Sequence, residues 1–96
     1  MFKTVGVVSR LDRKKALQLA DKIVDALKAK KLEVRLERSL AQQLHKQDLA
    51  TPLGKMKTDL VIIIGGDGTI LRTCLELPRP EPPILAVNMG VRGFLT

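Results

Sequence analysis

The sequence predicts an α/β fold, an open parallel sheet of about four strands with flanking helices. Residues 60–64 form an uninterrupted apolar run, which is typical of a strand buried on both faces of a parallel sheet. Strand-like runs also alternate with a stretch of helical periodicity along the chain, and this order produces parallel sheets. The 96 residues suffice for one small domain.

The first third of the chain predicts one strand–helix–strand unit. Residues 2–8 are rich in valine and predict a strand, in which Gly6 serves either ordinary strand packing or the close approach of a neighbouring backbone or a ligand. Residues 13–30 carry an apolar stripe at helical spacing, and Asp12 is placed to cap this helix. Residues 32–36 alternate apolar and charged side chains, which predicts a half-exposed strand.

The sequence patterns after residue 38 are less regular. Residues 39–57 indicate at most a short helix near Leu40, interrupted by proline and glycine. A strand, a glycine turn and a helix then extend over residues 59–77. The proline-rich residues 78–83 predict a stiff connector, and residues 84–87 predict the fourth strand.

The composition limits the possible partners. The chain is 45% hydrophobic but only 2% aromatic, so its core must be aliphatic. The formal net charge of +7 is compatible with nucleic-acid binding, but the chain has no interleaved aromatic residues, no zinc-ligand pattern and no known nucleic-acid motif. We therefore favour solvated helix faces and attraction for anionic substrates such as nucleotides, with no nucleic-acid partner.

The single cysteine and the hydropathy indicate a cytoplasmic protein without a membrane partner. Cys74 cannot form a disulfide within the chain and is expected to be a buried, inert thiol. No apolar stretch approaches the roughly 18 residues that a membrane span needs. The first residues lack the apolar region of a signal peptide. His45 has no partner at metal-ligand spacing, so no metal-ligating residue is predicted.

The turn Gly65–Thr69 follows the buried strand and precedes a helix. Backbone amides in such a turn point at an anion, and Gly66 and Gly68 would let a ligand approach the backbone closely. Asp67 does not fit this pattern, because a carboxylate repels phosphate. It must bind a metal, accept a proton from a hydroxyl group or hydrogen-bond a sugar, unless it only caps the helix.

A second turn begins at Asn88, at the carboxyl end of the next predicted strand. Ligands of open α/β sheets bind at the edge where the strands end. The two turns are therefore expected to face one cleft, although about twenty residues separate them in sequence.

These two motifs carry a resemblance to a known family. Gly65-Gly66-Asp67-Gly68-Thr69 resembles the signature of the superfamily of NAD kinases, diacylglycerol kinases and phosphofructokinases. The stretch from Asn88 to Thr96 is similar to the Asn-x-Gly-x-x-Gly-Phe-Leu-Thr pattern of the NAD kinase family. A Gly-Thr-Gly-Asn-Asp type motif of lipid kinases is absent from the sequence.

The resemblance implies a Rossmann-like domain that takes part in phosphoryl transfer. The donor would be ATP or inorganic polyphosphate, the acceptor would be the 2′-hydroxyl of the adenosine ribose of NAD, and the product would be NADP. Magnesium would enter chiefly through the phosphates. In this assignment Asp67 is the catalytic residue, hydrogen-bonding the hydroxyl and taking its proton.

Further residues are assigned to the nucleotides, each with a simpler alternative. Thr69 binds phosphate or only caps the helix, and Arg72 reaches a phosphate or only faces solvent. Phe94 borders the adenine pocket or only packs in the core. The complete set of nucleotide-binding candidates is Gly66, Asp67, Gly68, Thr69, Arg72, Asn88, Gly93 and Phe94.

The family resemblance also implies a second, mostly β domain that this sequence does not supply. Residues 1–96 are therefore expected to be the amino-terminal part of a larger kinase, which would be a homodimer or homotetramer when complete. An apolar edge would be exposed in this part, favouring self-association. Two alternatives stay open: a catalytically incomplete nucleotide-binding or regulatory module, and a lipid or sugar kinase of the same superfamily.

Overall fold

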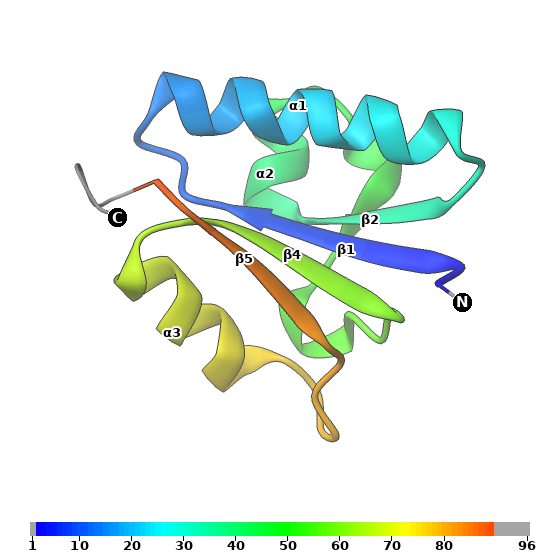
Figure 1. Cartoon of the computed structure of the whole chain (residues 1–96), viewed down its shortest axis with the longest axis vertical. Helices are drawn as coiled ribbons and strands as arrows, with labels where there is room; N and C mark the ends of the chain where they lie inside the picture. Colours follow the sequence, from blue (N-terminus) through cyan, green and yellow to red (C-terminus); the bar gives the residue numbers. More distant parts are fainter. Residues whose placement is uncertain (1, 90–96) are drawn as a thin grey trace.

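The computed structural model describes residues 2–89 and contains a five-stranded parallel sheet between two helical layers (Figure 1). The strand order is β3-β2-β1-β4-β5. The strands are β1 (Thr4–Ser9), β2 (Glu33–Glu37), β3 (Ala50–Thr51), β4 (Leu60–Gly65) and β5 (Ile84–Asn88). The helices are α1 (Lys14–Ala29), α2 (Arg38–Gln43) and α3 (Asp67–Glu76), with 3-10 turns η1 (Gln47–Leu49) and η2 (Leu53–Lys55).

The predicted α/β class and parallel sheet are confirmed, and a fifth strand is added. This strand, β3, has two residues and pairs with the end of β2 through Leu36 and Glu37. A strand of two residues carries no periodicity, so no sequence pattern could predict it. The short helix expected near Leu40 is α2, which buries Leu40 and Ala41.

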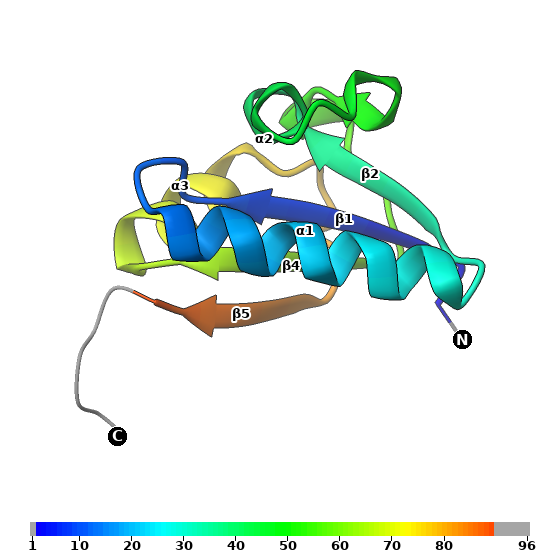
Figure 2. The ribbon, with the colours of Figure 1, turned by 90° about the horizontal axis from the view of Figure 1, so that it is seen from above.

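Strand β4 lies at the centre of two apolar clusters, one on each face of the sheet. Ile62 and Ile64 face the cluster that contains the buried residues of α1. Val61 and Ile63 face the other cluster, against which Ile70 of α3 packs. The strand is buried from Val61 to Gly65, so the prediction of a strand covered on both faces is confirmed. Figure 2 shows from above that α1 and α3 lie on opposite sides of the sheet.

Strand β2 is half-exposed, as its alternating pattern predicted. Val34 and Leu36 are buried, whereas Glu33 is exposed. Helix α1 covers the same face of the sheet through Ala16, Ala20 and Val24, which are fully buried. Small residues at these positions let the helix approach the sheet closely.

Two expectations about side chains are wrong. Asp12 does not cap α1, because its carboxylate binds the Arg10 guanidinium instead and the N-cap residue is Arg13, which makes no side-chain cap hydrogen bond. Cys74 is only half-buried. Helix α3 packs on the sheet through the partly buried Ile70 and Cys74, and Leu77, the residue after the helix, is buried in the same cluster.

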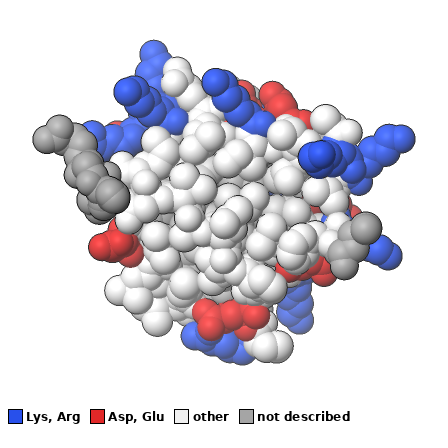
Figure 3. All heavy atoms as spheres, viewed as in Figure 1, with Lys and Arg blue, Asp and Glu red and all other residues white. Residues whose placement is uncertain are grey.

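The exposed apolar edge that the sequence predicted is present. Leu71 and Leu75 on α3 are 62% and 67% exposed, and Leu85 on the edge strand β5 is 53% exposed. Figure 3 shows that the face over β5 carries few charged groups, while Lys and Arg gather toward the rim. Self-association through this edge stays a prediction.

Gly6 in β1 leaves space for the Met56 side chain, so its role is packing and not the close approach of a ligand. A Cβ at this position would lie 2.5 Å from the Met56 sulfur and 3.2 Å from the Thr58 hydroxyl oxygen. Met56 is fully buried, so its side chain has little room to move.

We expect Gly6→Ala to lower the free energy of unfolding by about 1–3 kcal/mol, because the added methyl overpacks the contact with Met56. Gly54→Ala is the matched control, since the nearest atom to its added Cβ is the Glu76 carbonyl oxygen at 3.9 Å. Urea unfolding of both variants checks this. Equal stability of the two variants would contradict the packing role of Gly6.

Candidate functional site

The turn between β4 and α3 is closed tightly by its glycines. Strand β4 ends at Gly65, Gly66 precedes the helix, and the Ile70 amide donates to the Gly66 carbonyl oxygen at 3.1 Å. A Cβ on Gly65 would lie 2.8 Å from the Thr69 hydroxyl oxygen and 2.9 Å from Thr69 Cβ. A larger residue would therefore push the first turn of α3 away from the strand.

The first motif and the start of the second motif meet at the same edge of the sheet. Gly65 pairs in register with Asn88, and the Met89 amide donates to the Gly65 carbonyl oxygen at 2.8 Å. The Asn88 side-chain amide donates to Asp67 Oδ1 at 3.5 Å. The structure thus brings Asp67 and Asn88 together, as the predicted position of both turns at strand ends required.

Neither Asp67 nor Thr69 caps α3. The N-cap position belongs to Gly66 and no side-chain hydrogen bond caps the helix. Asp67 is the first residue of the helix and is exposed, so its carboxylate is open to a ligand as well as to Asn88. The capping alternatives for both residues are therefore wrong.

Gly68 has open space around it. A Cβ at this position would have no neighbouring atom within 4 Å. Packing within the described part of the chain gives no reason for a glycine here, and a helix interior normally disfavours one. A ligand that lies against the first turn of α3 would supply that reason.

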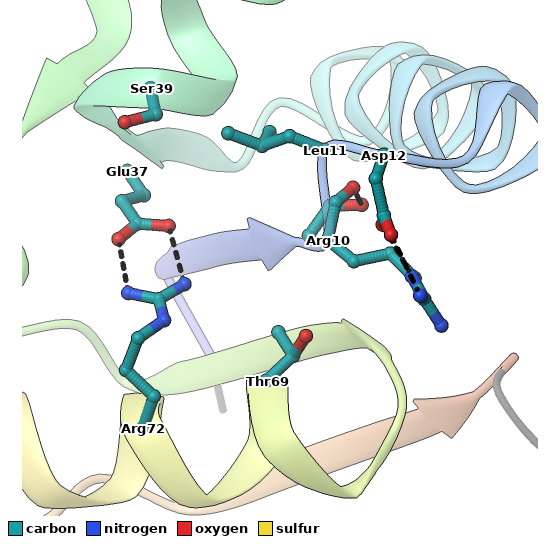
Figure 4. A pocket seen from close by; sticks show the side chains of 8 residues that line it. Arg10, Leu11, Asp12, Glu37, Ser39, Thr69 and Arg72 are labelled. Carbon is teal, nitrogen blue, oxygen red and sulfur yellow. Dashed lines mark hydrogen bonds and ion pairs between the residues drawn. The ribbon is translucent and has the colours of Figure 1, made fainter.

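A hollow of about 460 Å³ lies on the other flank of α3 (Figure 4). Thr69 and Arg72 line it from the helix, and the segment after β1 faces them across the hollow. Its remaining walls come from the junction of β2 and α2. The full lining is Ser9, Arg10, Leu11, Asp12, Glu37, Ser39, Thr69 and Arg72.

Both arginines of this hollow are held by carboxylates. Arg72 donates from both terminal nitrogens to Glu37, at 2.9 Å and 3.4 Å, and lies 3.9 Å from Glu76. The hydrogen bond to Glu37 raises the pKa of Arg72. Arg10 donates to both oxygens of Asp12, at 2.8 Å and 3.0 Å, and this hydrogen bond lowers the pKa of Asp12 to about 2.

The predicted site residues thus lie around the start of α3 in two groups. Asp67 and Asn88 lie on the β5 side, whereas Thr69 and Arg72 line the hollow on the side of β1 and β2. Gly66 and Gly68 belong to the turn itself. Gly93 and Phe94 lie outside the described residues.

Sequence reasoning missed five polar residues of the hollow: Ser9, Arg10, Asp12, Glu37 and Ser39. Glu37 is the last residue of β2, so the rule that ligands bind where parallel strands end could have found it. Ser9 and Arg10 mark the corresponding end of β1.

Residues 2–89 contain no cluster of three or more His, Cys, Asp or Glu side chains that would hold a metal ion. Within the same residues, no helix is long and apolar enough to cross a membrane.

Comparisons with known proteins agree on one family. A family model described as the ATP-NAD kinase N-terminal domain matches residues 5–96. The NAD kinase of Methanosphaera stadtmanae is 38% identical over 93 residues, which are 96% of this chain and 34% of that protein. The NAD kinase of Thermococcus kodakarensis is 41% identical over 93 residues, or 95% of this chain and 33% of that protein. The chain therefore spans about a third of the length of these relatives.

The pKa of Asp12 gives a direct test of the hollow's geometry. We expect its carboxyl group to titrate near the value of about 2, and Arg10→Ala to move this pKa up toward the ordinary 3.8, because the guanidinium hydrogen bond is the largest cause of the shift. Arg13→Ala, which removes only a weaker electrostatic effect, should move it less. Carbon-detected NMR titration of the side chain measures this. An unchanged pKa in Arg10→Ala would show that the pair does not form.

Proposed function

The chain belongs to the family of ATP-NAD kinase N-terminal domains, and we propose that it takes part in making NADP from NAD. A phosphoryl group would pass from ATP to the 2′-hydroxyl of the adenosine ribose. Since the relatives are about three times as long, we propose that this chain supplies the amino-terminal α/β part of such an enzyme. A second, β-rich part would complete the nucleotide pocket, and the complete protein would be a homodimer or homotetramer.

One observation carries this proposal: the exposed Asp67 carboxylate lies where the first motif meets the start of the second, 3.5 Å from the Asn88 side-chain amide. A carboxylate in this position can accept a hydrogen bond from a ribose hydroxyl. As the hydroxyl oxygen bonds to the γ-phosphorus, the bond from this phosphorus to the bridging oxygen breaks and ADP leaves, while the same carboxylate takes the hydroxyl proton. Asn88 would hold Asp67 in place through its side-chain amide.

The turn itself would receive the phosphates. The first amides of α3 have no partner within the helix, and the positive end of the helix dipole favours an anion there. Open space at Gly68 lets a phosphate come close to the backbone. Arg72 would add a positive charge further along the helix, and transfer would depend on this positioning and charge neutralisation.

Magnesium fits this site as part of the Mg-ATP complex. The ion would be held chiefly by the donor phosphates, because residues 2–89 contain no group of three or more His, Cys, Asp or Glu side chains that would hold it. When bound, the ion would neutralise charge on the phosphates. Inorganic polyphosphate would present similar phosphates and is the second possible donor. Phe94 would border the adenine, as the family pattern implies, and Gly93 would let the nucleotide approach the backbone closely.

The short span of the chain favours a second candidate function. With about a third of its relatives' length, the chain would by itself be an incomplete nucleotide-binding or regulatory module. NADP formation by the 96-residue chain, compared with the full product of its gene, distinguishes the two. Turnover by the full product alone would support the kinase, and no turnover by either would support the module.

We expect Asp67→Asn in the full product to abolish NADP formation while NAD affinity stays within about tenfold, roughly 1.4 kcal/mol, because the amide keeps the shape but cannot take the proton. Asp25→Asn on the exposed side of α1 is the control and should leave turnover unchanged. Coupled-enzyme assays of NADP and calorimetric titration with NAD give the two readings. Substantial turnover by Asp67→Asn would remove Asp67 from the chemistry.

We expect Gly68→Ala to weaken ATP binding without destabilising the fold. The methyl group enters open space, so we expect a stability equal to or up to about 1 kcal/mol above that of the parent protein. The KM for ATP should rise by about tenfold, because the methyl occupies the space that a phosphate needs. Thermal unfolding and steady-state kinetics measure the two effects. A normal KM in Gly68→Ala would show that no ligand approaches the backbone there.

A further inference from the structure

The Glu37 carboxylate is built into a rigid part of the fold. Glu37 is the last residue of β2, pairs with Thr51 of β3 and immediately precedes α2. Its side chain is only 13% exposed, whereas that of Arg72 is 44% exposed. Glu37 is therefore the fixed member of the ion pair and Arg72 is the member that it orients.

The pair leaves Arg72 able to bind a second anion. Two N–H···O contacts, at 2.9 Å and 3.4 Å, connect its terminal nitrogens to the two carboxylate oxygens. The planar guanidinium has further N–H donors that these contacts do not use. Because Arg72 lines the hollow and is half-exposed, those donors are accessible to a ligand entering it (Figure 4).

Without Glu37, Arg72 would have only the Glu76 carboxylate nearby with which to form an ion pair. Glu76 lies 3.9 Å from the same guanidinium, one turn further along α3 and therefore further from the glycine turn. The long arginine side chain loses much rotamer freedom when it is fixed, so an unpaired Arg72 would spread over several positions. The ion pair with Glu37 thus keeps the Arg72 guanidinium at the hollow.

We propose that Glu37 is a positioning residue, which holds Arg72 in the geometry that binds the phosphate chain of the donor in the hollow beside Thr69. This inference rests on the proposed function, since it takes the bound anion to be the donor's phosphates. The negative charge of Glu37 opposes an anion only weakly, because the guanidinium already neutralises it. When Glu37 is replaced, the loss of Arg72 orientation therefore weakens phosphate binding more than the removal of the negative charge strengthens it.

The test compares Glu37→Gln, Arg72→Ala and the double variant in the full product of the gene. We expect Glu37→Gln to raise the KM for ATP by about tenfold and to leave the KM for NAD unchanged. In the Arg72→Ala background, Glu37→Gln should have no further effect, because Glu37 acts only through Arg72. Glu76→Gln, which removes the weaker partner of the same arginine, is the control and should leave both KM values unchanged.

Binding of inorganic triphosphate, measured by calorimetry on the same proteins, gives a readout that needs no turnover. It should weaken by about tenfold in Glu37→Gln, again only while Arg72 is present. Tighter binding in Glu37→Gln would show that Glu37 competes with the anion, and an unchanged affinity would show that the pair is purely structural. Absence of triphosphate binding by the parent protein would overturn the inference as well.

The two proposals can fail separately. If the parent protein binds triphosphate with the expected dependence on Glu37 but makes no NADP, the kinase proposal fails and the positioning role stands. If NADP is made but Glu37→Gln and Arg72→Ala act independently, the positioning role fails and the kinase proposal stands.

Discussion

The close contact between Gly65 and Thr69 is the constraint on which the site depends. Because a Cβ on Gly65 would lie within 2.9 Å of Thr69, only glycine lets α3 start directly over the end of β4. This start places Asp67 beside Asn88 on one flank of the helix and directs Thr69 and Arg72 into the hollow on the other flank. The same backbone turn thus places the Asp67 carboxylate, which can accept a hydrogen bond from a hydroxyl group, on one flank. It places the Arg72 guanidinium, which can bind phosphate, on the other.

The charges around this turn are arranged in pairs. Arg10 is held by Asp12 and Arg72 by Glu37, so the hollow contains oriented cations rather than freely moving ones. Phosphoryl transfer depends on positioning more than on covalent chemistry, and oriented donors lose less entropy when a phosphate arrives. Asp67 makes no such ion pair among residues 2–89, and the long contact with Asn88 leaves it open to a substrate hydroxyl.

The sequence was a good guide wherever one periodic signal was strong. The continuous apolar run of β4, the alternation in β2 and the stripe of α1 each predicted the observed burial. Prediction from the sequence failed where contacts between residues far apart in the chain determine the structure. Two-residue β3 exists because it pairs with β2, and Asp12 binds Arg10 rather than the helix start. Glu37 was missed because its role depends on Arg72, which lies 35 residues away in sequence.

In the proposed complex the donor phosphates extend from the hollow beside Thr69 and Arg72, over the start of α3, to the acceptor ribose at Asp67 and Asn88. Amide chemical shifts of the ¹⁵N-labelled full product, recorded with inorganic triphosphate alone and with NAD alone, test it most directly. We expect triphosphate to shift the amide signals of Thr69 and Arg72 most strongly. We expect NAD to shift those of Asp67 and Asn88 most strongly. Shifts by both ligands on one flank only, or on neither, would contradict it.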